Sequence, residues 1–311
     1  MDEISVDNLF DRRVSFPEAD AMRRFSALVG IEDAKTRLVR SLGVLINPTG
    51  IHAWAKKHHK KDKMALLDFV ERRPPLVILA GDVGTGKTEL ASTVGDPVAR
   101  QEGIDIMLYP LSLSTRGSGR VGEMTKLMSA AFDETYKTAQ GMKGRSAKAS
   151  GAVILLVDEA DAIVQSREND QMHHEDRAGV NAFIRGIDRL AEQHLPAAVI
   201  LCTNRLGAID PAVRRRAAEI FVFDRPNPEQ RLAVLEAPLS EIGFTKKEIA
   251  EIVKRTGSTE ERDYGFTYSD LTQRFLPTIV IDAYPENPVT YERTLEVMKS
   301  IHPTAPFREL I

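Results

Sequence analysis

The chain is poor in cysteine: Cys202 is the single cysteine in 311 residues, so no intramolecular disulfide can form. A lone thiol suits a reducing compartment. Long hydrophobic runs are also absent, since residues 152–157 and 197–202, the longest, are far shorter than the roughly 20 residues that cross a bilayer. The first three residues, Met-Asp-Glu, are acidic and the N-terminus has no apolar core, so no signal peptide is expected. These absences predict a soluble protein of the cytoplasm.

Neither sign of charge dominates the chain. Its 42 basic residues against 45 acidic residues give a net charge of −3. This balance excludes a strongly basic nucleic-acid coat and an acidic disordered tail as descriptions of the whole chain. A content of 42% hydrophobic and 28% charged residues is typical of a globular protein that buries a sizeable core. The length favours about two domains, at roughly 150 residues each.

Short apolar runs alternate with helix-length segments in the first 225 residues. Strand-like runs occur at residues 76–80, 152–157, 197–202 and 220–223, with a weaker fifth run at 105–109. The first three are apolar at nearly every position, which is typical of strands covered on both faces of a parallel sheet. Residues 123–138 and 178–193 are of helix length. The alternation predicts an α/β fold with a five-stranded parallel sheet flanked by helices.

The pattern changes after Pro226, where only helical segments follow. They cover residues 228–242, 246–255, 268–283 and 289–301, and Pro277 must kink or split the third. We therefore expect an N-terminal extension at residues 1–24, an α/β domain at 25–225 and a small all-helical domain at 226–311.

Residues 81–88, with the letters GDVGTGKT, match the phosphate-binding loop pattern GxxxxGK[ST]. A predicted strand precedes them and a segment compatible with a helix, residues 89–94, follows, although the Gly-Asp-Pro at 95–97 should end that helix early. The glycines let successive backbone N–H groups turn towards phosphate oxygens at the positive end of a helix dipole. Lys87 would reach the β- and γ-phosphates of ATP, and the Thr88 hydroxyl would bind Mg²⁺. The predicted nucleotide-binding residues of this loop are Asp82, Val83, Gly84, Thr85, Gly86, Lys87 and Thr88.

Two acids, Asp158 and Glu159, follow the second apolar run directly. Open α/β sheets bind ligands at the carboxyl ends of their strands. Asp158 is suited to hold Mg²⁺ through its water shell, and Glu159 is suited to polarise a water for attack on the γ-phosphate. The alternative is that the acids cap the next helix. Residues 158–161 also spell DEAD, but a DEAD-box helicase needs a second lobe with its own strands, and only helical segments remain after the sheet.

Polar and basic residues follow the third apolar run. Asn204 stands at its end and could orient the attacking water or contact the γ-phosphate; the alternative is a cap for the following turn. Arg214, Arg215 and Arg216 are consecutive. We expect Arg215 and Arg216 to reach a nucleotide held by a neighbouring subunit, whereas the alternative is that they pair with surface acids.

These elements in this order resemble the AAA+ ATPases over roughly residues 25–300. The shared features are the phosphate-binding loop, the Asp-Glu pair, the asparagine at the next strand end, Asp-Pro-Ala followed by arginines, and a helical lid. Residues 27–32 are similar to the segment that flanks adenine in this superfamily. Within it, the chain looks most like the pachytene-checkpoint-type ATPases that remodel HORMA-domain proteins. That likeness depends on residues 112–113 before the presumed pore loop, on residues 181–183 and 187–188, and on the spacing from 209 to 217.

The resemblance implies a ring, expected to be a hexamer, that hydrolyses ATP with the help of Mg²⁺. The ATP would bind between the α/β domain and the lid. Lid movement would drive loops of the central channel against a protein substrate, here a HORMA-domain protein. Eukaryotic members carry an N-terminal adaptor domain, and no segment of this sequence is expected to form one. The chain is therefore similar to compact bacterial relatives that accompany HORMA proteins and a cyclic-oligonucleotide synthase in anti-phage signalling. No membrane is expected as a partner.

The chain departs from the family pattern in two places. The presumed pore loop, residues 114–120, lacks the aromatic residue that usually grips substrate. Ser269 stands where HORMA remodellers usually have a lid arginine. Residues 166–177 are a second candidate for the channel, and His173 and His174 within them lack a partner at the spacing of a zinc site.

Two alternatives remain open. One is a nucleic-acid-handling AAA+ protein, such as a loader or a transposition helper, which the basic run at residues 56–63 would serve. That run is more simply explained as a solvated helix end or loop, because no aromatic residues suited to base stacking interleave it. The other alternative is an unfoldase for a separate protease, since the chain has no His-Glu-x-x-His motif of its own.

Overall fold

The computed structural model describes residues 9–61, 63–112, 123–144, 149–160, 164, 174–260 and 262–307. The chain divides into two compact units. The first is built from Met1–Phe25, Asp33–Ala80 and Thr88–Val222, and the second from Ser26–Glu32, Gly81–Lys87 and Phe223–Ile311. The second unit therefore contains the helical region together with two short segments that precede it by far in the sequence, one of them most of the phosphate-binding loop.

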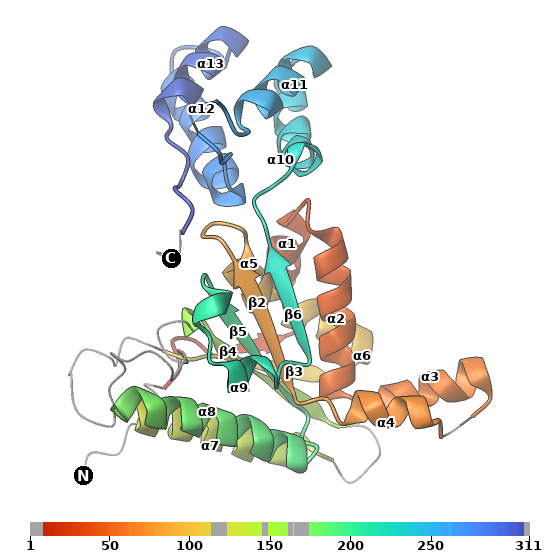
Figure 1. The fold of residues 1–311 in the computed structure, drawn as a ribbon. Coiled ribbons are helices and arrows are strands. Elements are labelled where there is room, and N and C mark those ends of the chain that lie inside the picture. The colour runs from red at the N-terminus through yellow and green to blue at the C-terminus, as the bar shows by residue number, and fades with distance from the viewer. Residues whose placement is uncertain are drawn as a thin grey trace. The chain divides into compact units, whose positions relative to one another are not determined.

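One sheet organises the first unit (Figure 1). In the described part of the chain it has six strands in the order β1-β3-β4-β5-β2-β6, five of them parallel as predicted. The strands are β1 (Val14–Phe16), β2 (Leu76–Gly81), β3 (Asp105–Pro110), β4 (Gly151–Val157), β5 (Ala197–Thr203) and β6 (Glu219–Phe223). Because β2, β5 and β4 are neighbours, their carboxyl ends share one edge, with Ala80 opposite Thr203 and Val157 opposite Leu201.

The strand β1, which pairs antiparallel with β3, was not predicted. It has only three residues, and the sole buried one is Phe16, so no apolar run marks it. Its ring packs on Gly95, where an added Cβ atom would lie 2.3 Å from the ring. The buried Asp96 carboxylate also accepts a 2.7 Å hydrogen bond from the backbone N–H of Glu18. A tertiary contact with α6 (Gly95–Glu102), rather than local pattern, therefore holds this strand.

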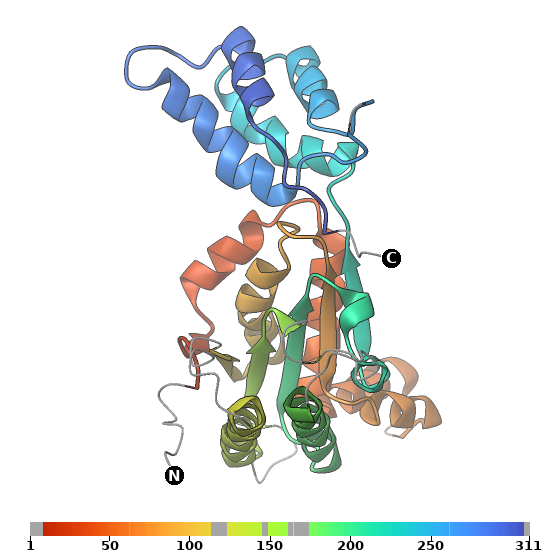
Figure 2. The same ribbon diagram turned by 60° about the vertical axis from the view of Figure 1, so that its left-hand side comes forward.

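Helices cover both faces of the sheet (Figures 1 and 2). The long helices α7 (Glu123–Met142) and α8 (His174–Glu192) pack together on one face, where alternate strand residues such as Ile78, Val153 and Val199 join their core. The other face carries α2 (Glu32–Ile46), α5 (Lys87–Thr93) and α6. As predicted, the helix after the phosphate-binding loop ends early, at Thr93. The remaining helices of this unit are α1 (Ala19–Ala27), α3 (Thr49–His59), α4 (Ala65–Glu71), η4 (Leu206–Ala208) and α9 (Pro211–Arg214).

The second unit has its own core and is helical. Its helices are α10 (Pro228–Glu241), α11 (Lys246–Arg255), η5 (Asp270–Phe275), α12 (Leu276–Ala283) and α13 (Tyr291–Ser300). Pro277 falls at the start of α12, and the preceding turn η5 is a π-helix, so the predicted interruption is confirmed. Capping boxes at Asn227 and Thr245 explain where α10 and α11 begin. Among the described residues after β6 there is no strand, which agrees with the exclusion of a two-lobed helicase.

The predicted basic run lies at the end of α3. Lys56, Lys57, His58 and His59 form its last turn, and Lys60 caps it with a left-handed backbone (φ 57°). Cations at a helix C-terminus are favoured by the helix dipole, so this run has a structural explanation. No helix among the described residues has the length and apolar content that a membrane span requires.

Candidate active site

The phosphate-binding loop follows β2 directly, and α5 begins at its Lys87. Gly84 (φ 74°) and Gly86 (φ 89°) adopt left-handed backbones, which residues with a side chain rarely do. Gly84 is also crowded, since an added Cβ atom would lie 2.7 Å from Thr267 Oγ1. The loop therefore has the tight, side-chain-free turn that presents backbone N–H groups to phosphate.

The Lys87 ammonium is held over its own loop. It is only 5% exposed and donates to the carbonyl oxygens of Gly81 (2.9 Å) and Asp82 (2.7 Å), while Thr85 Oγ1 donates to the Asp82 carbonyl at 2.8 Å. A buried cation that uses carbonyl acceptors is well suited to the stronger, charged acceptors of a phosphate chain. The residues present thus fit nucleotide phosphates.

Asp158 and Glu159 directly follow the buried strand β4. Asp158 is half-buried, and its Oδ1 accepts the backbone N–H of Glu159 at 2.8 Å. Glu159 is exposed and has a left-handed backbone (φ 48°), a conformation that is unfavourable for a residue with a side chain. The two acids therefore stand at the same edge of the sheet as the end of β2, as the sequence predicts.

Asn204 follows β5 and is half-buried. The next turn, η4, has Arg205 at its N-cap position and has no side-chain cap within the described chain. The backbone N–H of Arg205 is bound instead by Thr203 Oγ1 at 3.0 Å. Asn204 therefore does not act as the cap that was its alternative interpretation, and its amide stands at the strand edge next to β4 and β2.

The three arginines have different surroundings. Arg216 donates to both carboxylate oxygens of Asp188 on α8, at 2.7 and 2.9 Å, and to the Ala212 carbonyl at 3.0 Å. The hydrogen bonds to Asp188, together with its negative charge, outweigh burial and raise the pKa of Arg216 above its ordinary value. Arg215 is exposed and forms no ion pair with any residue that the structure describes. Arg216 thus forms the same-chain ion pair of the alternative interpretation, whereas Arg215 forms none with the described residues; a role of either arginine at a neighbouring subunit stays a prediction.

The segment predicted to flank adenine, residues 27–32, belongs to the unit that holds the phosphate-binding loop. Gly30 has a left-handed backbone (φ 82°), and its carbonyl accepts from Gln230 Nε2 (2.7 Å) and from Tyr268 Oη (3.2 Å). Burial, followed by the charge of Glu32, raises the pKa of Tyr268 to about 12, so this hydroxyl stays a donor over the physiological range. Sequence reasoning missed Gln230 and Tyr268, because their partner is a backbone atom about 200 residues away.

Two predicted features cannot be compared with the structure. The presumed pore loop at residues 114–120 and most of the second channel candidate at 166–177, with His173, lie outside the described residues. Within the residues described, no cluster of three His, Cys, Asp or Glu side chains could hold a metal ion. Thr88, which is exposed at the start of α5, and Asp158 remain the predicted Mg²⁺ residues.

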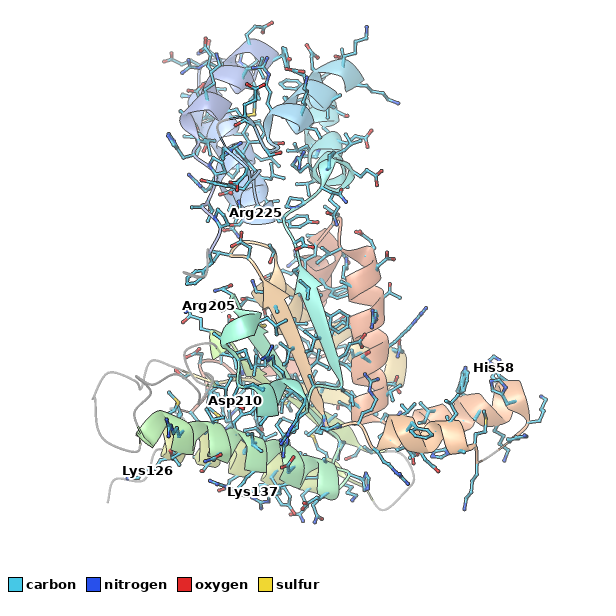
Figure 3. The ribbon with its side chains drawn as sticks, viewed as in Figure 1. His58, Lys126, Lys137, Arg205, Asp210 and Arg225 are labelled. Atoms are coloured by element: carbon cyan, nitrogen blue, oxygen red, sulfur yellow. The ribbon has the colours of Figure 1, made fainter. Side chains whose placement is uncertain are left out.

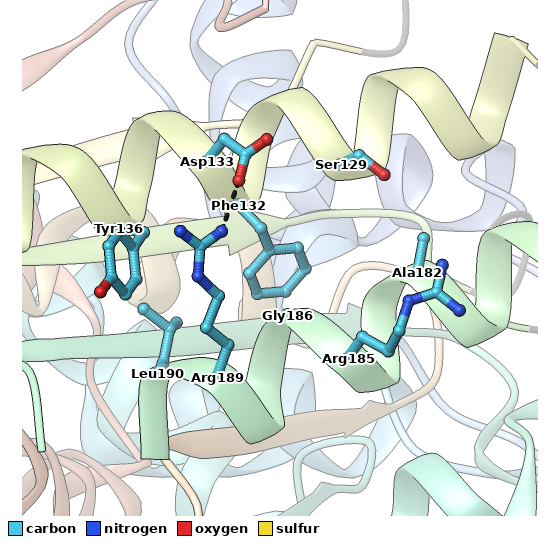
Figure 4. Close-up of a pocket in the computed structure, with 9 residues that line it drawn as sticks. All are labelled: Ser129, Phe132, Asp133, Tyr136, Ala182, Arg185, Gly186, Arg189 and Leu190. Carbon is cyan, nitrogen blue, oxygen red and sulfur yellow. Dashed lines mark hydrogen bonds and ion pairs between the residues drawn. The ribbon is translucent and has the colours of Figure 1, made fainter. Parts of the chain in front are cut away.

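A separate pocket of about 290 Å³ lies between α7 and α8 (Figure 4). The close approach of the helices depends on Gly186, where an added Cβ atom would lie 2.3 Å from the Phe132 ring. Arg189 pairs with Asp133 at 2.6 Å and lies over the ring of Tyr136. None of the predicted site residues lines this pocket, so it is distinct from the nucleotide site.

The chain is similar to known proteins over most of its length. Residues 77–225 match the family described as ATPase family associated with various cellular activities (AAA). CD-NTase-associated protein 6 of Escherichia coli (strain MS 115-1) is 59% identical over 303 residues, covering 97% of both chains. A chain in the structure of the E. coli MS115-1 HORMA:CdnC:Trip13 complex superposes with a TM-score of 0.91 at 58% identity, over 98% of this chain and 100% of that one.

A second solved structure, of Rhizobiales Trip13, matches with a TM-score of 0.76 at 51% identity, over 96% of this chain and 100% of that chain. These likenesses extend well beyond the matched ATPase segment and include the helical region. The chain therefore belongs to the AAA ATPase family, in the group of CD-NTase-associated protein 6, and is a nucleotide-binding protein with ATPase activity.

Proposed function

We propose that this chain is a Trip13-like remodeller that forms a hexameric ring and uses ATP hydrolysis to disassemble or unfold a HORMA-domain protein in anti-phage cyclic-oligonucleotide signalling. The observation that carries the proposal is the 59% identity over 97% of the chain with CD-NTase-associated protein 6. The likeness to a chain of a HORMA:CdnC:Trip13 complex, at 58% identity, supports the partner.

The chain's own residues divide the reaction among them. Backbone N–H groups of the loop from Asp82 to Thr88 bind the phosphates, and the Lys87 ammonium neutralises charge on the β- and γ-phosphates. Glu159 takes a proton from the attacking water, and the Asn204 amide orients that water from the neighbouring strand end. Arg215, supplied by the adjacent subunit, stabilises charge that develops on the γ-phosphate.

The Thr88 hydroxyl and, through water, the Asp158 carboxylate would hold Mg²⁺. The donor set fits this ion, because Mg²⁺ prefers oxygen ligands and is usually bound by one or two protein groups together with substrate phosphates. When bound, the ion neutralises phosphate charge.

The decisive experiment compares the ATPase rate of the purified chain alone and with three additions. These are the HORMA and CdnC proteins of E. coli MS115-1, double-stranded DNA, and a proteasome-like protease. We expect the HORMA and CdnC proteins to raise the ATPase rate severalfold, because ATP hydrolysis is expected to be coupled to work on the bound protein substrate. Stimulation by DNA or by the protease alone would contradict the proposal.

A matched variant separates the nucleic-acid alternative. Lys56→Glu and Lys60→Glu reverse two charges at the end of α3. This helix contributes no residue to the candidate active site. These changes should leave the HORMA-stimulated rate unchanged. If DNA raises the rate of the parent and not that of the variant, the chain is a nucleic-acid-handling ATPase that uses the basic run.

A further inference from the structure

The second residue of the phosphate-binding loop, Asp82, carries a carboxylate that is held from several directions. Arg225 Nε donates to Asp82 Oδ2 at 2.7 Å, and Arg225 Nη2 lies 2.6 Å from the same oxygen. The other oxygen, Oδ1, accepts the backbone N–H groups of Val83 (2.9 Å) and Phe307 (3.2 Å). The two charged side chains are 14% and 16% exposed, so water screens this ion pair less than one on the surface.

Arg225 connects this carboxylate to the segment that precedes η5. Its Nη1 donates to the Gly265 carbonyl at 2.7 Å, and its guanidinium lies over the Tyr264 ring at 5.0 Å. Four residues beyond Gly265, the backbone N–H of Ser269 donates to the carbonyl of Gly84 at 3.0 Å. Asp82 and Gly84, two residues apart in the loop, are thus fixed against one short segment, and Arg225 (labelled in Figure 3) supplies the charged contact.

A carboxylate in this loop is electrostatically unfavourable for its predicted ligand. The phosphates of ATP are anionic, and a negative side chain beside them repels the ligand in the same way that like charges disfavour each other elsewhere in proteins. The Arg225 guanidinium offsets this charge at a distance of 2.6 Å. It also limits the conformations of a loop whose glycines otherwise make it costly to order.

We propose that Arg225 is a positioning residue for nucleotide binding, which neutralises Asp82 and fixes the phosphate-binding loop against residues 264–269. The inference rests on nucleotide binding by this loop and is independent of the protein partner. Arg225 acts through Asp82 and contacts no reacting atom. Its loss therefore weakens ATP binding in two ways, by freeing the loop and by leaving an uncompensated negative charge in it.

The test is a titration of the full chain with a fluorescent ATP analogue, together with steady-state kinetics. Arg225→Ala should raise the Kd for the analogue and the KM for ATP about tenfold, the factor that corresponds to about 1.4 kcal/mol. The loss should fall on KM rather than on kcat. Arg225→Lys keeps the positive charge without the planar guanidinium and its several donors. Its Kd and KM should lie between those of the parent and of Arg225→Ala.

A second substitution separates the electrostatic role from a purely structural one. In the Asp82→Asn background the repulsive charge is gone, so adding Arg225→Ala should weaken binding by much less than tenfold. Added salt should also narrow the difference between the parent and Arg225→Ala, because it screens the free carboxylate. A merely structural role would give the same loss in both backgrounds and at both salt concentrations.

Arg293→Ala is the matched control. Arg293 pairs with Asp282 through two hydrogen bonds of 2.7 and 2.8 Å in the same unit, on α13 and α12 and away from the loop. Its removal should leave the Kd for the analogue at the parent value. The proposal is overturned if Arg225→Ala binds the analogue as tightly as the parent does. It is also overturned if Arg225→Ala weakens binding of the analogue equally in the parent and in the Asp82→Asn background. Failure of the parent itself to bind the analogue would instead refute nucleotide binding by this chain.

Discussion

Glu159 is the residue whose backbone conformation points most directly to chemistry. Its left-handed backbone (φ 48°) costs a residue with a side chain roughly 1–2 kcal/mol, and such conformations cluster at active sites. The hydrogen bond from its N–H to Asp158 Oδ1, together with the buried strand before it, holds the conformation in place. The local strain thus aims an exposed carboxylate outwards from the strand edge instead of continuing the strand.

Glu159→Gln should bind ATP with near-parent affinity and hydrolyse it about a hundred- to ten-thousand-fold more slowly, because an amide cannot accept the proton of the attacking water. Nucleotide titration and a single-turnover assay measure the two effects separately. The variant should also accumulate ATP-bound rings with the protein substrate.

Glu192→Gln makes the same chemical change at the exposed end of α8 and serves as the control. Its turnover should match that of the parent. If Glu159→Gln also turned over at the parent rate, another group would activate the water and the assigned base would be wrong.

At the scale of elements, one buried carboxylate accepts hydrogen bonds from several segments of the helical unit. Asp270, at the start of η5, is fully buried and accepts the N–H of Thr267 (3.0 Å), the N–H and hydroxyl of Thr304 (3.0 and 2.8 Å) and Arg274 Nη1 (2.9 Å). These bonds join the segment before η5 to the C-terminal segment. The C-terminal segment then reaches the phosphate-binding loop through the N–H of Phe307.

Burial alone would raise the pKa of the Asp270 carboxyl, but the hydrogen bonds from Thr267, Thr304 and Arg274 outweigh burial and hold the pKa below its ordinary value. Because the pKa is lower in the folded than in the unfolded state, the carboxylate contributes stability that is complete above the unfolded value of about 3.9. That contribution is lost as the pH falls through the folded-state pKa.

Asp270→Asn should lower the free energy of unfolding of the helical unit by about 2 kcal/mol at neutral pH, the range found for hydrogen bonds to a charged group. Amide hydrogen exchange of α12 and α13, compared between parent and variant, measures the loss. Below the unfolded-state pKa of about 3.9 the difference should shrink, because the unfolded parent then takes up a proton that the folded carboxylate, with its lower pKa, does not yet bind.

Asp282→Asn is the control, because Asp282 is an exposed aspartate that pairs with Arg293 in the same unit. Water screens an exposed ion pair, so the removal of this one should change exchange in α12 much less. Equal effects of the two substitutions would show that burial of Asp270 has no special role.

At the scale of the whole molecule, ring assembly is the property on which hydrolysis is expected to depend. Arg216 is engaged by Asp188 in its own chain, whereas Arg215, one residue before it, is exposed. An arginine that completes a neighbour's site must be free to leave its own surface. We therefore propose Arg215 as the arginine of the shared site, next to an Arg216 that is held by Asp188.

Lys87→Ala and Arg215→Ala should each inactivate a uniform ring, and the two variants should partly rescue each other when mixed. In a mixed ring some interfaces combine an intact phosphate-binding loop with an intact arginine from the neighbour. A cation that stabilises transition-state charge on the γ-phosphate is worth roughly a thousand-fold in rate, so the recovery is measurable as ATPase activity. Subunit exchange is verified first by fluorescence transfer between labelled protomers.

Arg216→Ala provides the comparison for the mixing experiment. It should cost about 1 kcal/mol of stability or less and retain substantial activity. Mixed rings that exchange subunits without any recovery, together with full activity of Arg215→Ala alone, would contradict a role in trans and would leave Arg214 or a residue of the helical unit to be considered.

The sequence by itself determined those parts of the protein that depend on local pattern. The buried strands β2, β4 and β5 are apolar at nearly every position, and such runs predict parallel strands whose carboxyl ends meet. The sequence alone therefore places the polar residues that follow these strands at one edge of the sheet. Helix bounds in the second unit were equally predictable, because capping boxes and Pro277 are local signals.

Only the tertiary structure decided the features that depend on partners distant in the sequence. The strand β1 exists because Phe16 packs on Gly95, and the phosphate-binding loop is fixed by Arg225, which lies 143 residues away from Asp82. Folding likewise distinguished Arg215 from Arg216, two adjacent and chemically identical side chains, by bringing Asp188 to only one of them. A sequence pattern reports periodicity and local propensity, whereas the choice of an ion-pair partner depends on which surfaces the completed fold brings together.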